Sequence, residues 1–122
     1  MNHSRTTPSC ESASAAVEIA IIAPVFLTLL FAAFQGALML WTQIGLQHAT
    51  ERAARCAAID ASLCGSADLV KAYAVTQALA AKIPDSSFTL SNASCGRLIT
   101  GTTTVKIFST NFTLNASSCF PH

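Results

Sequence analysis

The sequence predicts an α+β protein in which a long N-terminal transmembrane helix extends into a small extracytoplasmic head of one further helix and a short antiparallel sheet. Three observations predict it. Residues 19–41 are apolar and uncharged, residues 66–82 have helical apolar spacing, and residues 88–114 are rich in threonine and β-branched side chains. At 122 residues the chain is too short for two ordinary domains. We expect a cytoplasmic leader over residues 1–13, the long helix over 14–60 and the head over 61–122.

The composition favours a membrane protein. Hydrophobic residues make up 52% of the chain and charged residues only 11%, against roughly 45–50% and about 25% in soluble domains. The net charge of +1, from seven basic and six acidic residues, excludes a basic nucleic-acid surface as the main theme. We therefore expect the membrane and other proteins as partners, with no nucleic acid and no small-molecule substrate.

The apolar run over residues 19–41 is the predicted membrane span. As a helix, its 23 residues would reach about 34 Å, enough to cross a hydrocarbon core of about 30 Å. Trp41 ends the run, at the position where an indole would lie among the lipid headgroups. The run is too long for the apolar core of a cleaved secretory signal, so a membrane anchor is the better interpretation.

We expect the helix to continue beyond Trp41 into the head. One narrow face of this extension carries mostly small side chains, at steps of three, four and three residues: Leu46, Ala49, Ala53 and Cys56. Another element could pack closely against such a face. Arg52 and Arg55 are interpreted as part of a solvated helical face rather than as a binding patch.

A second helix is predicted from Ser66, a good N-cap, to about Lys82, with Pro84 ending it. We expect its apolar side to consist of Leu69, Ala72, Tyr73, Val75, Leu79 and Ile83. Two to four strands should follow, over residues 88–90, 97–100, 102–110 and 112–114. A tight hairpin at Gly101 and a single bulged strand through it both fit the pattern.

Four of the five cysteines follow the membrane run: Cys56, Cys64, Cys95 and Cys119. An even number in a small head suggests disulfides in an oxidising compartment, and therefore an extracytoplasmic head. The basic residues on the two sides of the span do not decide the orientation. Of the three possible pairings we favour Cys56–Cys64 with Cys95–Cys119. The first bridge would fix the angle between the two helices, and the second would tie the C-terminal tail to the sheet.

No motif for catalysis is found in the sequence. It contains no glycine-rich phosphate loop, no G-x-S-x-G and no H-E-x-x-H, and the spacing of His48 to the cysteines matches no usual zinc site. We expect no enzyme, no catalytic residue, no cofactor and no metal ligand.

Glu18 needs an explanation because its carboxylate lies at the entrance of the apolar run. A hydrated position at the headgroup level is one interpretation; a cationic partner within the membrane or an assembly is the other. No Lys or Arg in the run can supply that cation. The α-amine of Ser14 would supply it if the chain were cut just before that residue.

Residues 14–24, SAAVEIAIIAP, resemble the start of the TadE-like pseudopilins, minor subunits of tight-adherence type IV pili. In that family a short polar leader precedes a small residue, a segment A-A-V-E-F-A-L-x-x-P and a long apolar helix. Residues 40–58, LWTQIGLQHATERAARCAA, are similar to the family's juxtamembrane helix. The resemblance implies a subunit that takes part in assembly of the pilus for surface attachment. Its implied partners are other pilins, the assembly machinery and the prepilin peptidase. The implied location is the bacterial inner membrane, with a cytoplasmic N-terminus and a periplasmic C-terminus.

The resemblance also implies roles for three residues. Type IV pilins carry a glutamate at the fifth mature position, so Glu18 makes Ser14 the first mature residue and Ala13 the last of the leader. The family usually has glycine where this chain has Ala13, and alanine is the smallest replacement. Glu18 would pair with the Ser14 amine of a neighbouring subunit during assembly. The alternatives are a single-pass membrane protein that is never processed, with a small extracytoplasmic interaction domain, and a secreted disulfide-rich ligand or toxin.

Overall fold

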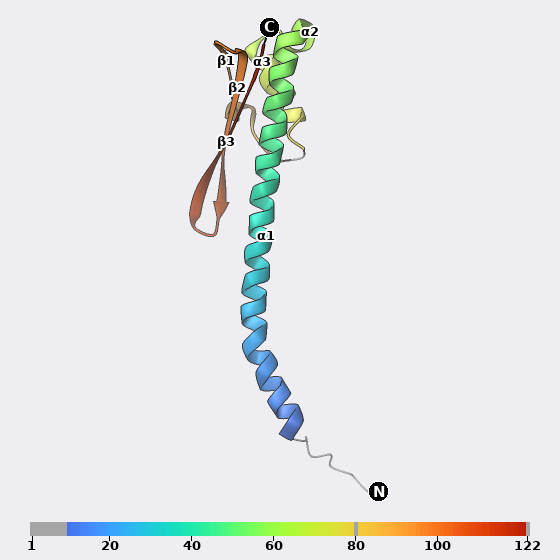
Figure 1. Cartoon of the computed structure of the whole chain (residues 1–122), viewed down its shortest axis with the longest axis vertical. Coiled ribbons are helices and arrows are strands. Elements are labelled where there is room, and N and C mark those ends of the chain that lie inside the picture. The colour runs from blue at the N-terminus through green and yellow to red at the C-terminus, as the bar shows by residue number, and fades with distance from the viewer. Residues whose placement is uncertain (1–9, 80, 122) are drawn as a thin grey trace, which may run out of the picture. The chain divides into compact units, whose positions relative to one another are not determined.

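The computed structural model describes residues 10–79 and 81–121, and their side chains from residue 13 onward; most of the predicted leader lies outside the described residues. The helices are α1 (Cys10–Ile59), α2 (Ala61–Cys64) and α3 (Ala67–Thr76), followed by the 3₁₀ turn η1 (Asp85–Ser87) (Figure 1). The strands are β1 (Phe88–Ala93), β2 (Gly96–Ile107) and β3 (Thr110–Phe120). The predicted α+β class, a long apolar helix followed by a small helix and an antiparallel sheet, is confirmed. The chain forms two compact units, one ending at Gly36 and the other comprising Ala37–His122.

The first unit contains the N-terminal part of α1, which is apolar on all sides. Between Ala13 and Gly36 nearly every side chain is exposed, including large residues such as Ile21 and Phe31. Pro24 lies inside the helix, where the lost N–H is tolerated better in a membrane than in water. Among the described residues α1 is the one helix long and apolar enough to cross a bilayer. This is consistent with a single-pass membrane anchor.

The second unit contains the sheet, whose strand order is β1-β2-β3 with antiparallel pairing throughout. Phe88 pairs with Gly101 at one end of the β1–β2 ladder, and β2 continues past it to Ile107, which pairs with Thr110 of β3. The register is unbroken on both sides of Gly101. Both predictions for this glycine, a hairpin turn and a bulge, are therefore wrong.

Gly101 lies where the sheet approaches α1. A Cβ atom added there would lie 2.7 Å from Leu46 Cδ1 and 3.0 Å from Thr50 Cγ2. Gly45 has the same function on another side of α1, since a Cβ there would lie 2.6 Å from the carbonyl oxygen of Ala78. Glycine at these two positions permits close packing of α1 against its neighbours.

The core of this unit forms around the small-residue face of α1. Leu46, Ala49 and Ala53 have no exposed surface, which confirms the predicted face, and Cys56 is half-buried beside it. Outside α1, the described residues of this unit with almost no exposed surface are Cys64, Val70, Ala74, Ala78, Ile83, Phe88 and Ile99. Because most of these side chains are small, the core depends on close approach of backbones rather than on large apolar side chains.

The second helix differs from the prediction in length and in face. Ser66 caps it as expected, with Oγ accepting a hydrogen bond from the Leu69 N–H, but α3 ends at Thr76. The backbone at Leu79 then adopts φ +50°, a left-handed conformation that no helix continues through. The buried residues in and just after α3 are Val70, Ala74 and Ala78, whereas Leu69 is 48% exposed. Of the predicted apolar side, Ile83 is buried and Tyr73 packs against the core, whereas Ala72, Val75 and Leu79 are exposed like Leu69. The predicted apolar face is therefore right only in part.

Candidate assembly site and head surface

Ser14 and Glu18 lie one helical turn apart in α1, so they share a face of the helix. Both side chains are exposed, and the neighbours of Glu18 are the exposed apolar side chains of Val17 and Ile19. Among the described residues the Glu18 carboxylate has no hydrogen-bond or ion-pair partner within the chain. A carboxylate in this position is available to a group from outside the chain.

The Ala13–Ser14 bond lies inside α1, which begins at Cys10. In the uncut chain the Ser14 nitrogen is an uncharged peptide nitrogen, so it offers Glu18 no cation. Cutting this bond would create an ammonium group one turn from the carboxylate. The bond lies in the first turns of the helix, where local opening costs least free energy.

Two disulfides fasten the head. Cys56 is joined to Cys64, with Cα atoms 5.7 Å apart, and Cys95 is joined to Cys119, with Cα atoms 6.2 Å apart. These are the pairs that the sequence favours. The first ties the last turns of α1 to the end of α2, and the second ties the β1–β2 turn to the end of β3.

Asp60 organises the turn between α1 and α2. Its Oδ1 atom accepts hydrogen bonds from the Ser62 N–H at 3.0 Å and the Leu63 N–H at 3.1 Å, and also from the Ser62 hydroxyl. The Ser62 hydroxyl first, and then the Leu63 and Ser62 N–H groups, hold the pKa of this carboxyl below its ordinary value. Asp60 is therefore an ionised N-cap that orients α2 for the Cys56–Cys64 bridge.

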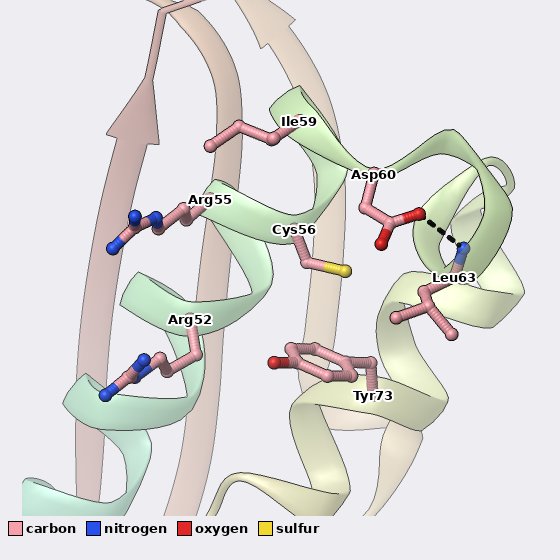
Figure 2. A pocket seen from close by; sticks show the side chains of 7 residues that line it. All are labelled: Arg52, Arg55, Cys56, Ile59, Asp60, Leu63 and Tyr73. Carbon is pink, nitrogen blue, oxygen red and sulfur yellow. Dashed lines mark hydrogen bonds between the residues drawn. The ribbon is translucent and has the colours of Figure 1, made fainter.

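Two shallow hollows flank the arginines near the end of α1. The first, of about 250 Å³, is lined by Arg52, Arg55, Cys56, Ile59, Asp60, Leu63 and Tyr73 (Figure 2). In Figure 2 the two arginines extend to the same side, away from Asp60, and Tyr73 of α3 lies next to Cys56. The second hollow, of about 400 Å³, is lined by the same arginines with His48, Glu51, Ser118 and Phe120. Arg52 and Arg55 are exposed, which confirms the predicted solvated face.

His48 contacts the segment that follows α3. Its Nδ1 atom lies 2.9 Å from the carbonyl oxygen of Gln77, to which a protonated Nδ1 donates, and this contact joins α1 to the segment after α3. Within residues 10–79 and 81–121, no three His, Cys, Asp or Glu side chains are grouped so that they could hold a metal ion.

The segment that carries Ser14, Glu18 and both arginines matches a known family. Residues 13–55 match the TadE-like protein family. The match implies a Tad pilus-associated protein, and the family consists generally of structural, non-enzymatic proteins. No curated protein and no solved structure matches the chain.

The TadE-like match begins at Ala13 and ends at Arg55, so it covers most of α1 and none of the strands. The residues expected to act in processing and assembly all lie inside it. Sequence reasoning missed Asp60 and Phe108, which lie outside it. Aspartate directly before A-S-L is a local N-cap signal that could have indicated α2, whereas no sequence signal indicates the exposed conformation of Phe108.

Proposed function

We propose that this TadE-like chain is a minor pilin-like subunit that takes part in assembly of a tight-adherence type IV pilus for surface attachment. In this proposal α1 anchors the chain in the bacterial inner membrane, with the N-terminus in the cytoplasm and the head in the periplasm. The position of Glu18 carries the proposal. It is an exposed carboxylate among apolar side chains at one end of the anchor, inside the segment that matches the family.

Processing is the first step of the proposed function. The prepilin peptidase cuts between Ala13 and Ser14 and so removes the cytoplasmic leader, residues 1–13. The small side chain at position 13 suits a narrow peptidase site. Ala13→Gly should therefore leave cleavage intact or speed it, whereas Ala13→Leu should block it, as measured by the mass of the membrane-bound chain.

Assembly is the second step. The ammonium group of Ser14 and the carboxylate of Glu18 belong to neighbouring subunits, because each would be costly to bury alone when the helices leave the membrane for the fibre. Pairing across subunits neutralises both charges. Since the two groups are one turn apart in each helix, their pairing also sets the axial offset between adjacent subunits.

The test compares Glu18→Ala with Glu51→Ala, which removes an exposed carboxylate from the same helix but within the second compact unit. We expect both variants to insert in the membrane and to be cleaved like the parent chain. Only Glu18→Ala should be depleted from pili and from crosslinked complexes with other pilins. Equal incorporation of both variants would contradict the pairing and favour a hydrated Glu18 at the membrane surface. A chain that is never cleaved or incorporated would favour the unprocessed single-pass protein.

A further inference from the structure

The β2–β3 hairpin reaches well beyond β1. Strand β1 pairs with β2 only as far as Gly101, so residues 102–107 and 110–115 form a two-stranded ribbon. Figure 1 shows this ribbon extending past the end of β1, with its tip towards the Ala37 end of the second unit. Within this ribbon Leu114 is buried and Val105 packs against the core, so the exposed end is the turn around residues 108–112.

Contacts along α1 place the tip relative to Trp41. Gly101 lies against Leu46 and Thr50. One residue pair further along the ribbon, the carbonyl of Asn115 accepts a hydrogen bond from Gln43 Nε2 at 3.0 Å. The ribbon therefore runs towards the N-terminal side of this part of α1. Five residues of β3 separate Asn115 from the turn, a strand length of about 17 Å, while Trp41 is only about 3 Å below Gln43 along the helix axis.

The tip thus extends at least to the level of Trp41, even when the ribbon is strongly tilted. At this level α1 presents exposed apolar side chains, with Leu40 65% and Trp41 55% exposed. In a chain anchored by α1, the level of Trp41 is the boundary between the hydrocarbon core and the lipid headgroups.

The side chains at the tip suit that boundary. Phe108 is 76% exposed, and Phe112, which pairs with Val105 on the face of the ribbon that also carries the buried Leu114, is 40% exposed. Lys106 is exposed on the opposite face, where it pairs with Asn111. The whole sheet, residues 88–120, has no acidic side chain and carries Arg97 and Lys106 as its two basic ones. Two exposed aromatic side chains and a cation near one turn, without any carboxylate, match the interface of an anionic bilayer.

Phe108 also has a backbone conformation that folding alone does not explain. Its φ of +54° lies in the left-handed region, which costs a non-glycine residue roughly 1–2 kcal/mol. The turn would be more stable with Gly or Asn at this position. A bulky aromatic side chain, held in a costly conformation and left in solvent, indicates a contact made by the side chain itself.

We propose that the β2–β3 hairpin tip is a second membrane contact, in which Phe108 and Phe112 enter the headgroup region of an anionic bilayer and Lys106 contacts lipid phosphates. This inference rests on the proposed membrane anchor. The contact fixes the tilt of the head relative to the bilayer while the subunit waits for assembly. It is released when the subunit leaves the membrane.

Tryptophan fluorescence of the full chain in vesicles tests this contact. The vesicles contain phosphatidylcholine and phosphatidylglycerol with brominated acyl chains, which quench a nearby indole. Trp41 is the single tryptophan, so the parent chain reports on the anchor. Phe108→Trp in a Trp41→Phe background reports on the tip. Ser94→Trp in the same background is the matched control, since Ser94 lies exposed in the turn at the other end of the sheet.

We expect the Phe108→Trp chain to lose intensity in brominated vesicles and to emit at shorter wavelength, as Trp41 does in the parent chain. The Ser94→Trp chain should show neither effect. If Trp41 is quenched and the Phe108→Trp chain behaves like the Ser94→Trp chain, the tip contact is overturned and the anchor stands. If the shift occurs without quenching and grows with the protein-to-lipid ratio, the tip contacts a second copy, which also overturns the lipid contact. If Trp41 itself is not quenched, the anchor fails, and the inference fails with it.

Discussion

Gly101→Ala tests the helix–sheet contact on which the head is built. The added methyl group would lie 2.7 Å from Leu46 Cδ1 and 3.0 Å from Thr50 Cγ2, and neither of these side chains has any exposed surface. Because both are enclosed, they cannot swing into solvent. The sheet must move away from α1, or Leu46 must leave its preferred rotamer.

The magnitude follows from two opposing effects. Overpacking a core costs about 1–3 kcal/mol, and replacing glycine in a strand returns about 0.5–1 kcal/mol by restricting the unfolded chain. We expect Gly101→Ala to lower the free energy of unfolding by about 1 kcal/mol. Leu46→Val shortens this buried side chain by one carbon and removes the Cδ1 atom that the new methyl group would contact. By itself this substitution should lower the free energy of unfolding by about 1 kcal/mol.

The two substitutions should not add. In the double variant the alanine methyl fills space vacated by Leu46, so the total loss should be about 1 kcal/mol rather than about 2 kcal/mol. Urea unfolding of the full chain in detergent measures each value, with near-ultraviolet circular dichroism of the half-buried Tyr73 as the signal. Ile83→Val is the control partner, since Ile83 is buried but is not among the atoms nearest to the added methyl. Additive losses for Gly101→Ala and Leu46→Val would refute the close approach of β2 to α1.

Three further predictions concern the head. Non-reducing peptide mapping should find only Cys56–Cys64 and Cys95–Cys119, and crossed pairs or four thiols would contradict the fold. Removing the first pair should lower the free energy of unfolding by about 2.5 kcal/mol, and removing the second, which closes a longer loop, by about 3.5 kcal/mol. Because the pKa of Asp60 is lowered from 3.8, its cap should stabilise the head fully above that value and be lost as the pH falls through the lower folded pKa. The free energy of unfolding of Asp60→Asn should not show this decrease at acidic pH. Identical pH profiles for the variant and the parent chain would exclude a contribution from the Asp60 carboxylate. Phe108→Gly should raise the free energy of unfolding in detergent by about 1 kcal/mol, and a loss of stability would show that the aromatic ring supports the hairpin.

Much of the fold follows from local patterns. The apolar run, the small residues facing one side of α1 and the threonine-rich strands each predict the element that the structure contains. The end of α3 could not be predicted, because the apolar spacing continues to Ile83 while the backbone turns left-handed at Leu79. The prediction for the buried side of this segment was wrong in part, because apolar character alone does not decide which side chains are buried. Leu69 is more apolar than Ala74, yet Ala74 is fully buried and Leu69 is 48% exposed.

The functional residues also divide into those that the sequence indicates and those that only the structure identifies. Glu18 is conspicuous in the sequence because a carboxylate in an apolar run has few explanations, and its distance from Ser14 follows from simple counting. Gly101 was misinterpreted because glycine serves turns and close contacts equally well, and only the three-dimensional contact with Leu46 separates them. Phe108 gave no signal, since neither its exposure nor its φ is encoded in a local pattern.

The mass of the N-terminal peptide, taken from chains in sheared pili and in membranes of cells with active prepilin peptidase, tests the central claim most directly. The account predicts chains that begin at Ser14 in both fractions, with residues 1–13 absent. Recovery of only the full 122-residue chain, confined to the membrane fraction, would contradict it.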